Sequence, residues 1–219
     1  MREQTFADAE AAAGAGAKLI ADAARDAIGQ AGRLALAISG GRTPLAMFER
    51  LGELEVDWDH VDLFQVDERI APDGDDDRNM THIRDSLPEA ALARLRPMPV
   101  TDEDLEAAAT RYAGELPKPL DLVHLGIGPD GHTASLVPGD PVLEVTDRLV
   151  ALTGGEYQAR RRMTLTYPAL AEARSVFWLI AGEDKRDALA KLLAGDPSIP
   201  AGRVEAAAAR VLADRAAAG

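Results

Sequence analysis

The sequence contains no cysteine and few aromatic residues. With no thiol among its 219 residues, disulfide bonds, thiolate catalysis and cysteine-based metal sites are excluded. Aromatic residues account for only 4% of the chain, so alanine, leucine and valine must supply most of the core. The hydrophobic fraction of 47% is nevertheless ordinary for a globular protein.

Long apolar runs are also missing. No run approaches the ~20 residues that are needed to span a bilayer. Residues 1–5 are polar and lead into an alanine-rich helical pattern, which is not a secretory signal. We therefore expect a cytoplasmic protein that has no membrane partner.

Positive charge is scarce. Lysine and arginine number 24 against 37 acidic residues, which gives a net charge of -13. This balance disfavours a nucleic-acid partner and repels anionic metabolites at long range. An anionic ligand would therefore need positive charge that is concentrated locally.

Short apolar runs alternate with helical patterns along the whole chain. Because the runs are continuous rather than alternating, they are typical of parallel strands covered on both faces. The sequence predicts one domain over residues 1–219, an open, doubly wound, Rossmann-like α/β fold with a mostly parallel sheet and helices on both faces. We expect strands at residues 33–39, 61–66, 94–100, 120–125, 149–152, 162–166 and 175–181, and helices at residues 8–28, 45–51, 79–87, 105–115, 183–193 and 204–217.

Ligands of such sheets bind beyond the carboxyl ends of the strands. The segments at these ends are expected to meet at one edge. They are residues 39–44, 67–69 and 126–135, Arg162, and the turn before Lys185.

A glycine-rich segment, residues 126–139, follows one buried strand. Its Gly126, Gly128 and Gly131 match the dinucleotide-binding pattern G-x-G-x-x-G. That pattern requires a helix to begin within the glycines, but Pro129 interrupts it and Pro138 limits any helix to about two turns. No acidic residue follows at the expected distance of about 20 positions. The sequence therefore does not predict a nucleotide site here.

His132, in the same segment, is the best candidate for a general base. The ordinary pKa of histidine, about 6.5, suits proton transfer at neutral pH. Either Asp130 or Asp67 could orient its ring. The nucleophile elbow G-x-S-x-G is absent, so water would be the direct nucleophile. No two histidines have the helical spacing of metal ligands, so no metal is expected. We expect His124 to be a core or edge residue, and His60 and His82 to be surface residues.

Residues 39–44 form a candidate anion site at a strand-to-helix turn. Their glycines let backbone N–H groups converge at a helix N-terminus, with Pro44 expected at the first helical position. Arg42 adds a charged fork suited to phosphate. A tight turn with an exposed arginine is the alternative. The candidate phosphate ligands are Ser39, Gly40, Gly41, Arg42 and Thr43.

Three further charged positions lie at the same expected edge. Residues 67–69 (Asp-Glu-Arg) end a strand and could contact a substrate or form an ion pair. Lys185 begins a helix, where a cation is disfavoured by the helix dipole, so it either meets an anion or is a solvated lysine. Arg162 begins a strand and could point along it toward the site.

Together these segments resemble the glucosamine-6-phosphate isomerase/6-phosphogluconolactonase family, and in particular its 6-phosphogluconolactonases. The block Gly-Pro-Asp-Gly-His-Thr-Ala-Ser-Leu is specific to this group. The matching segments occur in the order typical of the family and span nearly the whole chain. They are residues 39–44, 67–69, Asn79, 126–139, 162–166 and 182–185.

The resemblance implies hydrolysis of 6-phospho-D-glucono-1,5-lactone, a small sugar-phosphate lactone, to 6-phosphogluconate, without a metal or other cofactor. His132 would activate water, Asp130 and Asp67 would orient groups around it, and Arg69 would stabilise the oxyanion. We expect a monomer or a weak homo-oligomer. The residues that the resemblance places around the phosphate and sugar are Ser39, Gly40, Gly41, Arg42, Thr43, Asn79, Gly128, Arg162 and Lys185.

Two departures from the family pattern concern specificity. Position 42 is arginine where many relatives have serine, and residues 77–79 read Asp-Arg-Asn where many have Asp-Ser-Asn. Two alternatives remain. A glucosamine-6-phosphate deaminase/isomerase usually carries Phe-Asn-Glu-Pro where this chain has residues 133–138. A sugar-phosphate-sensing regulator would need an attached DNA-binding helix pair, for which the chain has neither room nor a basic patch.

Overall fold

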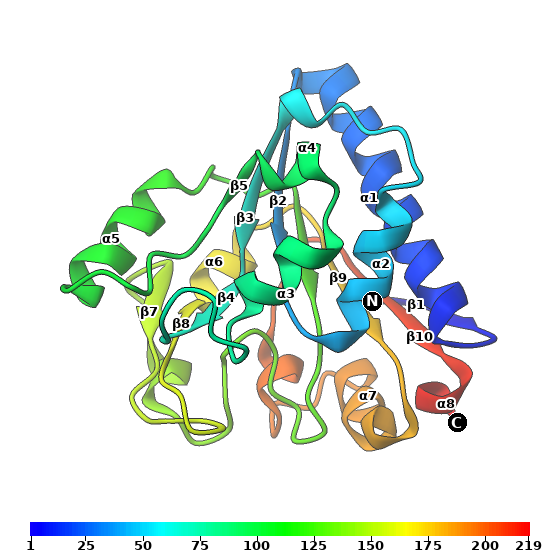
Figure 1. Cartoon of the computed structure of the whole chain (residues 1–219). Coiled ribbons are helices and arrows are strands. Elements are labelled where there is room, and N and C mark those ends of the chain that lie inside the picture. Colours follow the sequence, from blue (N-terminus) through cyan, green and yellow to red (C-terminus); the bar gives the residue numbers. More distant parts are fainter.

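The computed structural model describes residues 1–219 apart from the side chain of Arg42. Seven strands form a parallel sheet in the order β1-β10-β9-β6-β2-β3-β5 (Figure 1), and three form a separate antiparallel sheet in the order β4-β8-β7. The expected doubly wound α/β class is therefore confirmed. The large sheet comprises β1 (Arg2–Phe6), β2 (Leu34–Ile38), β3 (Val61–Gln65), β5 (Leu95–Arg96), β6 (Leu122–Leu125), β9 (Val176–Ile180) and β10 (Ala209–Asp214).

The remaining elements cover the sheet or extend its edge. The small sheet comprises β4 (Asp67–Arg69), β7 (Val150–Leu152) and β8 (Arg162–Leu165). The helices are α1 (Ala9–Ala31), α2 (Arg42–Leu51), α3 (Asn79–Ser86), α4 (Glu89–Leu92), α5 (Leu105–Glu115), α6 (Tyr167–Ala171), α7 (Arg186–Leu193) and α8 (Arg215–Ala218). Short 3₁₀ turns lie at Trp58–His60, Pro141–Glu144, Glu183–Lys185 and Pro200–Arg203.

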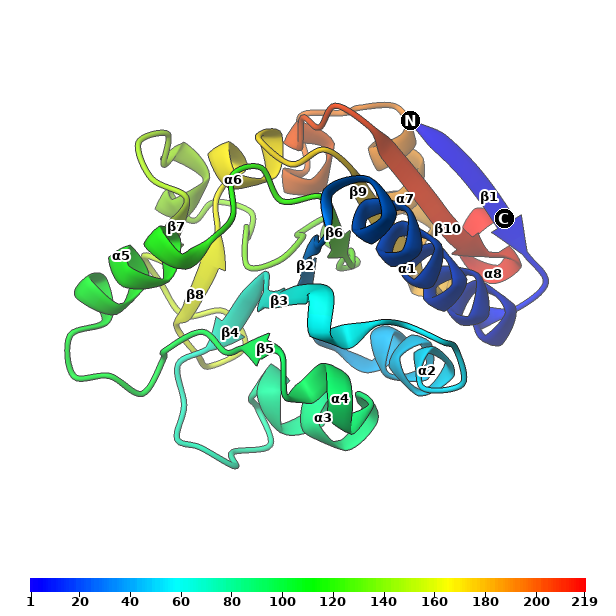
Figure 2. The same ribbon diagram turned by 90° about the horizontal axis from the view of Figure 1, so that it is seen from above.

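Two hydrophobic cores lie on opposite faces of the large sheet. In β2, Leu36 and Ile38 pack with residues of α1, α2 and α3, whereas Ala35 and Ala37 pack with residues of α5, α6 and α7. Figure 2 shows α1 and α2 on one side of the sheet and α5 and α6 on the other. Because β2, β3, β6 and β9 are buried at every position, their sequences are largely apolar rather than strictly alternating.

The C-terminal part of the chain corrects the sequence prediction. Residues 204–217 do not form a helix: Ala209–Asp214 is a strand between β9 and β1, and only Arg215–Ala218 is helical. The run Glu-Ala-Ala-Ala-Ala favours a helix locally, but pairing on both sides of β10 outweighs that weak preference. The strand β1 was not predicted, and its exposed, polar residues explain why.

Two smaller boundaries also differ from the prediction. The strand expected at residues 94–100 is reduced to Leu95–Arg96. Helix α2 begins at Arg42, so Pro44 is its third residue rather than its first. The proline is tolerated there because the first four N–H groups of a helix have no intrahelical partner.

The order in which successive strands join the large sheet reverses beside β2. From β2 the chain moves through β3 to β5 on one side, whereas β6, β9 and β10 follow on the other. The loops that follow β2 and β6 therefore run in opposite directions from the carboxyl ends of these two strands, which point toward the lower edge of Figure 1. Such a switch point is where open α/β sheets bind ligands. No helix in the described part of the chain is long and apolar enough to cross a membrane.

Candidate active site

The loop after β6 folds back on itself instead of starting a helix. The next regular element is the 3₁₀ turn at Pro141–Glu144, so the glycines do not form a dinucleotide-binding turn. The Gly128 N–H donates to the His132 carbonyl at 2.9 Å, and Thr133 Oγ1 donates to the Gly126 carbonyl at 2.8 Å. A Cβ on Gly128 would lie 2.1 Å from His132 Nδ1. Gly128 is therefore required by the close approach of the His132 ring.

His132 and Asp130 form a hydrogen-bonded pair on this loop. His132 Nδ1 lies 2.6 Å from Asp130 Oδ1, and the His132 N–H donates to the same oxygen at 3.2 Å. Burial by itself would raise the pKa of Asp130, but the hydrogen bond and charge of His132 outweigh it and hold that pKa below its usual value. An ionised Asp130 accepts from Nδ1–H and leaves the lone pair of Nε2 free to accept a proton. Asp130, rather than Asp67, thus orients His132.

Asp67 belongs to a second, more deeply buried network. Its Oδ2 accepts from Ser135 Oγ at 2.6 Å, and Arg162 Nη1 donates to the same hydroxyl at 3.4 Å. Asn79 Nδ2 donates to Asp67 Oδ1 at 3.3 Å. Ser135 was not predicted as a site residue, although it stands within the glycine-rich block. The network joins Ser135, in the loop after β6, to the first residues of β4, α3 and β8.

Arg162 of this network and its strand neighbour Arg69 keep unused hydrogen-bond donors. Arg69 and Arg162 are partners in the pairing of β4 with β8, and Arg162 is buried. The Nε atoms of both have no hydrogen-bond partner among the described residues. The guanidinium groups of Arg69 and Arg162 place two positive charges on adjacent strands, and this local charge favours an anionic ligand at this edge.

The segment after β2 approaches Asn79 closely. A Cβ on Gly40 would lie 2.4 Å from Asn79 Cγ, so only glycine fits beside that side chain. Gly41 has a φ of 112° and precedes the first turn of α2. The N-terminus of α2, which includes Thr43, therefore faces the carboxyl edge of the sheet with its partial positive charge. The side chain of Arg42 lies outside the described residues.

Lys185 is brought to the same sheet edge but is not joined to the other predicted residues. It ends the 3₁₀ turn Glu183–Lys185 after β9 and caps the N-terminus of α7. Its Nζ lies 3.0 Å from Asp184 Oδ2, and its side chain is 21% exposed. The neighbouring acid compensates a cation that the helix dipole disfavours.

Tyr157, which the sequence analysis missed, contacts the His132 pair. Its hydroxyl donates to Asp130 Oδ2 at 3.0 Å and lies 3.3 Å from His132 Nδ1. The tyrosine stands in the loop between β7 and β8, outside every motif, and no local pattern pointed to it.

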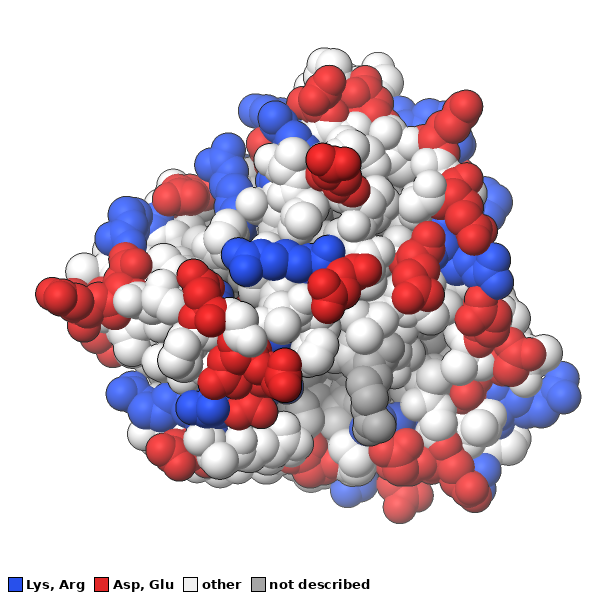
Figure 3. Space-filling view, viewed as in Figure 1, with Lys and Arg blue, Asp and Glu red and all other residues white. Residues whose placement is uncertain are grey.

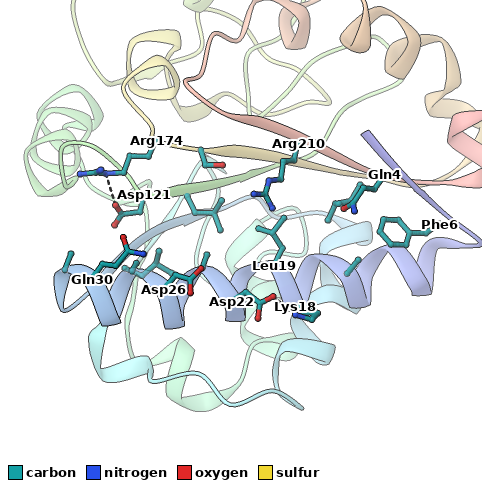
Figure 4. Close-up of a pocket in the computed structure, with 18 residues that line it drawn as sticks. Gln4, Phe6, Lys18, Leu19, Asp22, Asp26, Gln30, Asp121, Arg174 and Arg210 are labelled. Atoms are coloured by element: carbon teal, nitrogen blue, oxygen red, sulfur yellow. Dashed lines mark hydrogen bonds and ion pairs between the residues drawn. The ribbon is translucent and has the colours of Figure 1, made fainter. Parts of the chain in front are cut away.

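A groove elsewhere on the surface contains none of the predicted site residues. It lies between α1 and the sheet, and is lined by residues of β1 and β10 and by residues at or just before the starts of β2, β6 and β9 (Figure 4). Two of its charged residues, Arg174 and Lys18, form ion pairs with Asp121 and Asp22. Because ligands of this fold bind at the opposite ends of the strands, the groove is not the expected active site.

His124 supports the start of the loop after β2 and makes the fold sensitive to acid. Its Nδ1 accepts from the Ser39 N–H at 3.3 Å, and its ring packs between Phe48 and Phe177. Burial lowers the pKa of His124 from 6.5 to about 3. Between pH 6.5 and about 3, His124 is therefore protonated in the unfolded chain but not in the folded chain. Stability from this group is complete above pH 6.5 and falls by about 1.4 kcal/mol per pH unit as the pH drops toward 3.

We expect the free energy of unfolding of a His124→Leu variant to depend less steeply on pH between 6.5 and about 3 than that of the unsubstituted chain. Urea unfolding of both proteins at several pH values measures the two slopes. The comparison of slopes is independent of any constant change in packing. Parallel slopes would show that His124 is not the acid-sensitive group.

Known proteins are similar to this chain over most of its length. The model of the family glucosamine-6-phosphate isomerases/6-phosphogluconolactonase matches residues 7–213. The 6-phosphogluconolactonase of Mycobacterium tuberculosis is 35% identical over 219 aligned residues, covering 90% of this chain and 89% of the relative. That of Rhizobium meliloti is 40% identical over 175 residues, 75% of each chain.

Solved structures agree with these matches. The 6-phosphogluconolactonase from Thermotoga maritima has a TM-score of 0.88 at 26% identity, covering 98% of this chain and 99% of that one. A monomeric glucosamine-6-phosphate deaminase has a TM-score of 0.82 at 20% identity, covering 100% of this chain and 99% of that one, which shows a shared fold. The family model and the relatives extend over most of the sequence, and the chain therefore belongs to the glucosamine-6-phosphate isomerase/6-phosphogluconolactonase family.

Proposed function

We propose that this chain hydrolyses 6-phospho-D-glucono-1,5-lactone to 6-phospho-D-gluconate, the second step of the oxidative pentose phosphate pathway. The observation that carries the proposal is the Asp130–His132 pair, with 2.6 Å between Oδ1 and Nδ1, on the loop beside the switch point of the sheet. The names of the family's 6-phosphogluconolactonases supply the substrate class.

In this proposal His132 is the general base. Its Nε2 takes a proton from water as the water oxygen attacks the lactone carbonyl, and Asp130 stabilises the imidazolium that forms. The carbonyl oxygen gains negative charge, which the guanidinium of Arg69 stabilises. The proton then passes from His132 to the ring oxygen as the ester bond breaks, which gives a hydroxyl and a carboxylic acid. The acid releases its remaining proton to solvent and becomes the carboxylate. Asp67 holds Ser135 beside Arg162 rather than acting on His132.

The phosphate binds at the other end of the same edge. The N-terminus of α2 and the positive charge of Arg162 support this placement. Ser39, Gly40 and Asn79 form the wall of the site beside the sugar. Gly40 has no side chain, and this leaves the room that the Asn79 side chain occupies. The proposed ligands of the phosphate are Gly40, Gly41, Arg42, Thr43, Arg162 and Lys185, with Ser39, Asn79 and Gly128 beside the sugar.

On this proposal, residues 1–219 form one domain, and the protein works in the cytoplasm as a monomer or weak homo-oligomer that binds no nucleic acid. The net charge of -13 supports the last point, because a phosphodiester backbone would be repelled.

A direct assay tests the proposed function. We expect the purified chain to accelerate the loss of freshly made 6-phosphogluconolactone above its spontaneous hydrolysis. Gluconolactone without the phosphate is the matched substrate, and its kcat/KM should be lower by at least about 10²-fold, because charge-assisted bonds to the phosphate are lost. Release of ammonia from glucosamine 6-phosphate, with no lactone hydrolysis, would instead identify a deaminase. A folded sample that leaves the lactone rate unchanged would refute the proposal.

A further inference from the structure

We infer that Tyr157 is a positioning residue that holds Asp130 and His132 in the arrangement needed for proton transfer. This inference rests on the proposed function and adds a residue that no motif contains. The Tyr157 hydroxyl donates to Asp130 Oδ2 at 3.0 Å, while His132 Nδ1 uses Oδ1 at 2.6 Å. Both carboxylate oxygens are therefore occupied, so the carboxylate cannot rotate without breaking a hydrogen bond.

The tyrosine ring also links the two ends of the proposed site. Its centroid lies 5.1 Å from that of His132, with an interplanar angle of 63°, which is an edge-to-face contact. The Arg162 guanidinium carbon lies 5.0 Å from the same centroid. The ring thus contacts both the proposed general base and a proposed phosphate ligand.

The loop that carries Tyr157 is held in an unfavourable backbone conformation. The Tyr157 N–H donates to the Arg160 carbonyl at 3.0 Å, and between them Gln158 and Ala159 have φ values of 54° and 61°. A two-residue turn of this kind favours glycine or asparagine. Neither residue here is of that kind, and such strain persists only where the surroundings impose it.

Ion pairs to the opposite loop impose this conformation. Arg160 Nη2 lies 3.0 Å from Asp75 Oδ2, and Arg160 Nε lies 2.8 Å from Asp77 Oδ2. Asp75 and Asp77 belong to the acidic segment between β4 and α3, where acidic side chains gather in Figure 3. Arg162 Nη2 adds a hydrogen bond to the Tyr157 carbonyl at 3.2 Å. These contacts connect the two loops that flank the site and direct Tyr157 at Asp130.

The hydroxyl remains a donor at neutral pH. Burial and the adjacent Asp130 carboxylate raise the pKa of Tyr157 above its usual value. The other charged group that faces the ring is Arg162. Tyr157 therefore keeps its proton at neutral pH and can donate it to Asp130, which is what a fixed support for the pair requires.

Tyr157→Phe removes the hydroxyl and keeps the ring. We expect kcat for the lactone to fall by about ten-fold, with KM changed by less than about two-fold, because only the orientation of the base is affected. In an Asp130→Asn background the same substitution should cost less than about two-fold, since the hydroxyl acts through that carboxylate. Tyr167→Phe is the matched control: its hydroxyl donates to the Pro200 carbonyl at 3.0 Å and its ring lies 4.9 Å from the Arg203 guanidinium, so kcat should not change.

A second measurement needs no substrate. In NMR spectra of the free protein, the Nδ1–H proton of His132 should give a resolved signal that broadens in Tyr157→Phe and stays unchanged in Tyr167→Phe. An unchanged signal together with unchanged kcat in Tyr157→Phe would overturn the inference, as would equal losses with and without the Asp130→Asn substitution. An inactive parent chain whose His132 signal still depends on Tyr157 would refute the proposed function and leave the positioning role supported.

Discussion

Replacing His132 with alanine is expected to lower kcat for 6-phosphogluconolactone by about 10²–10⁴, with little change in KM. In the proposed mechanism the imidazole accepts the proton of the attacking water, and its hydrogen bond to Asp130 at 2.6 Å holds the ring for that step. KM depends mainly on the phosphate end of the site, which the substitution does not touch. Steady-state kinetics of the two proteins, corrected for spontaneous hydrolysis, measure both constants.

A second histidine–aspartate pair provides the control for this experiment. His60 Nδ1 lies 2.8 Å from Asp57 Oδ2, but the pair is exposed, beside the start of β3 rather than at its carboxyl end. His60→Ala should therefore retain the kcat of the unsubstituted chain. If His132→Ala also retained it, His132 would have no part in proton transfer and the proposed mechanism would be wrong.

Replacing Glu68 with alanine is expected to lower the free energy of unfolding by about 3–5 kcal/mol, the cost of breaking a buried charged network. Glu68 is 0% exposed. Its Oε1 accepts from the Arg69 and Asn79 N–H groups at 2.8 and 2.7 Å, and its Oε2 accepts from the Met80 N–H at 2.8 Å and from Gln65 Nε2 at 2.9 Å. Alanine would leave these buried donors without a partner.

Urea unfolding monitored by circular dichroism measures this change. Glu49→Ala on α2 is the matched control, because Glu49 is exposed and its loss should alter stability by less than about 0.5 kcal/mol. A loss below about 1 kcal/mol in Glu68→Ala would show that the buried network contributes little. Because Glu68 holds the N-terminus of α3, the substitution should also displace Asn79 and with it Asp67.

The position of the site follows from patterns that are local in the sequence. Continuous apolar runs at β2, β3, β6 and β9 indicated parallel strands, and the polar residues after each run indicated the carboxyl edge. His132 and Asp130 stand two residues apart on one loop, so the sequence already offered Asp130, beside Asp67, as a partner for His132. The wrong prediction of a helix at residues 204–217 also came from a local pattern. An alanine-rich segment prefers a helix, and only its pairing with β9 and β1 in the folded sheet overrides that preference.

The amino-acid sequence by itself determined the order of most strands and helices, and it indicated the edge proposed to bind the ligand and the residue proposed to act as a base. Only the tertiary structure decided that Asp130 rather than Asp67 orients His132, that Glu68 is a buried cap rather than a substrate contact, and that Tyr157 joins the pair. Several of these contacts join segments that are distant in the sequence, 25 residues apart for Tyr157 and His132 and 68 for Ser135 and Asp67. They depend on strand register and on turn conformation, such as the positive φ of Gln158 and Ala159, which residue types and spacing do not reveal.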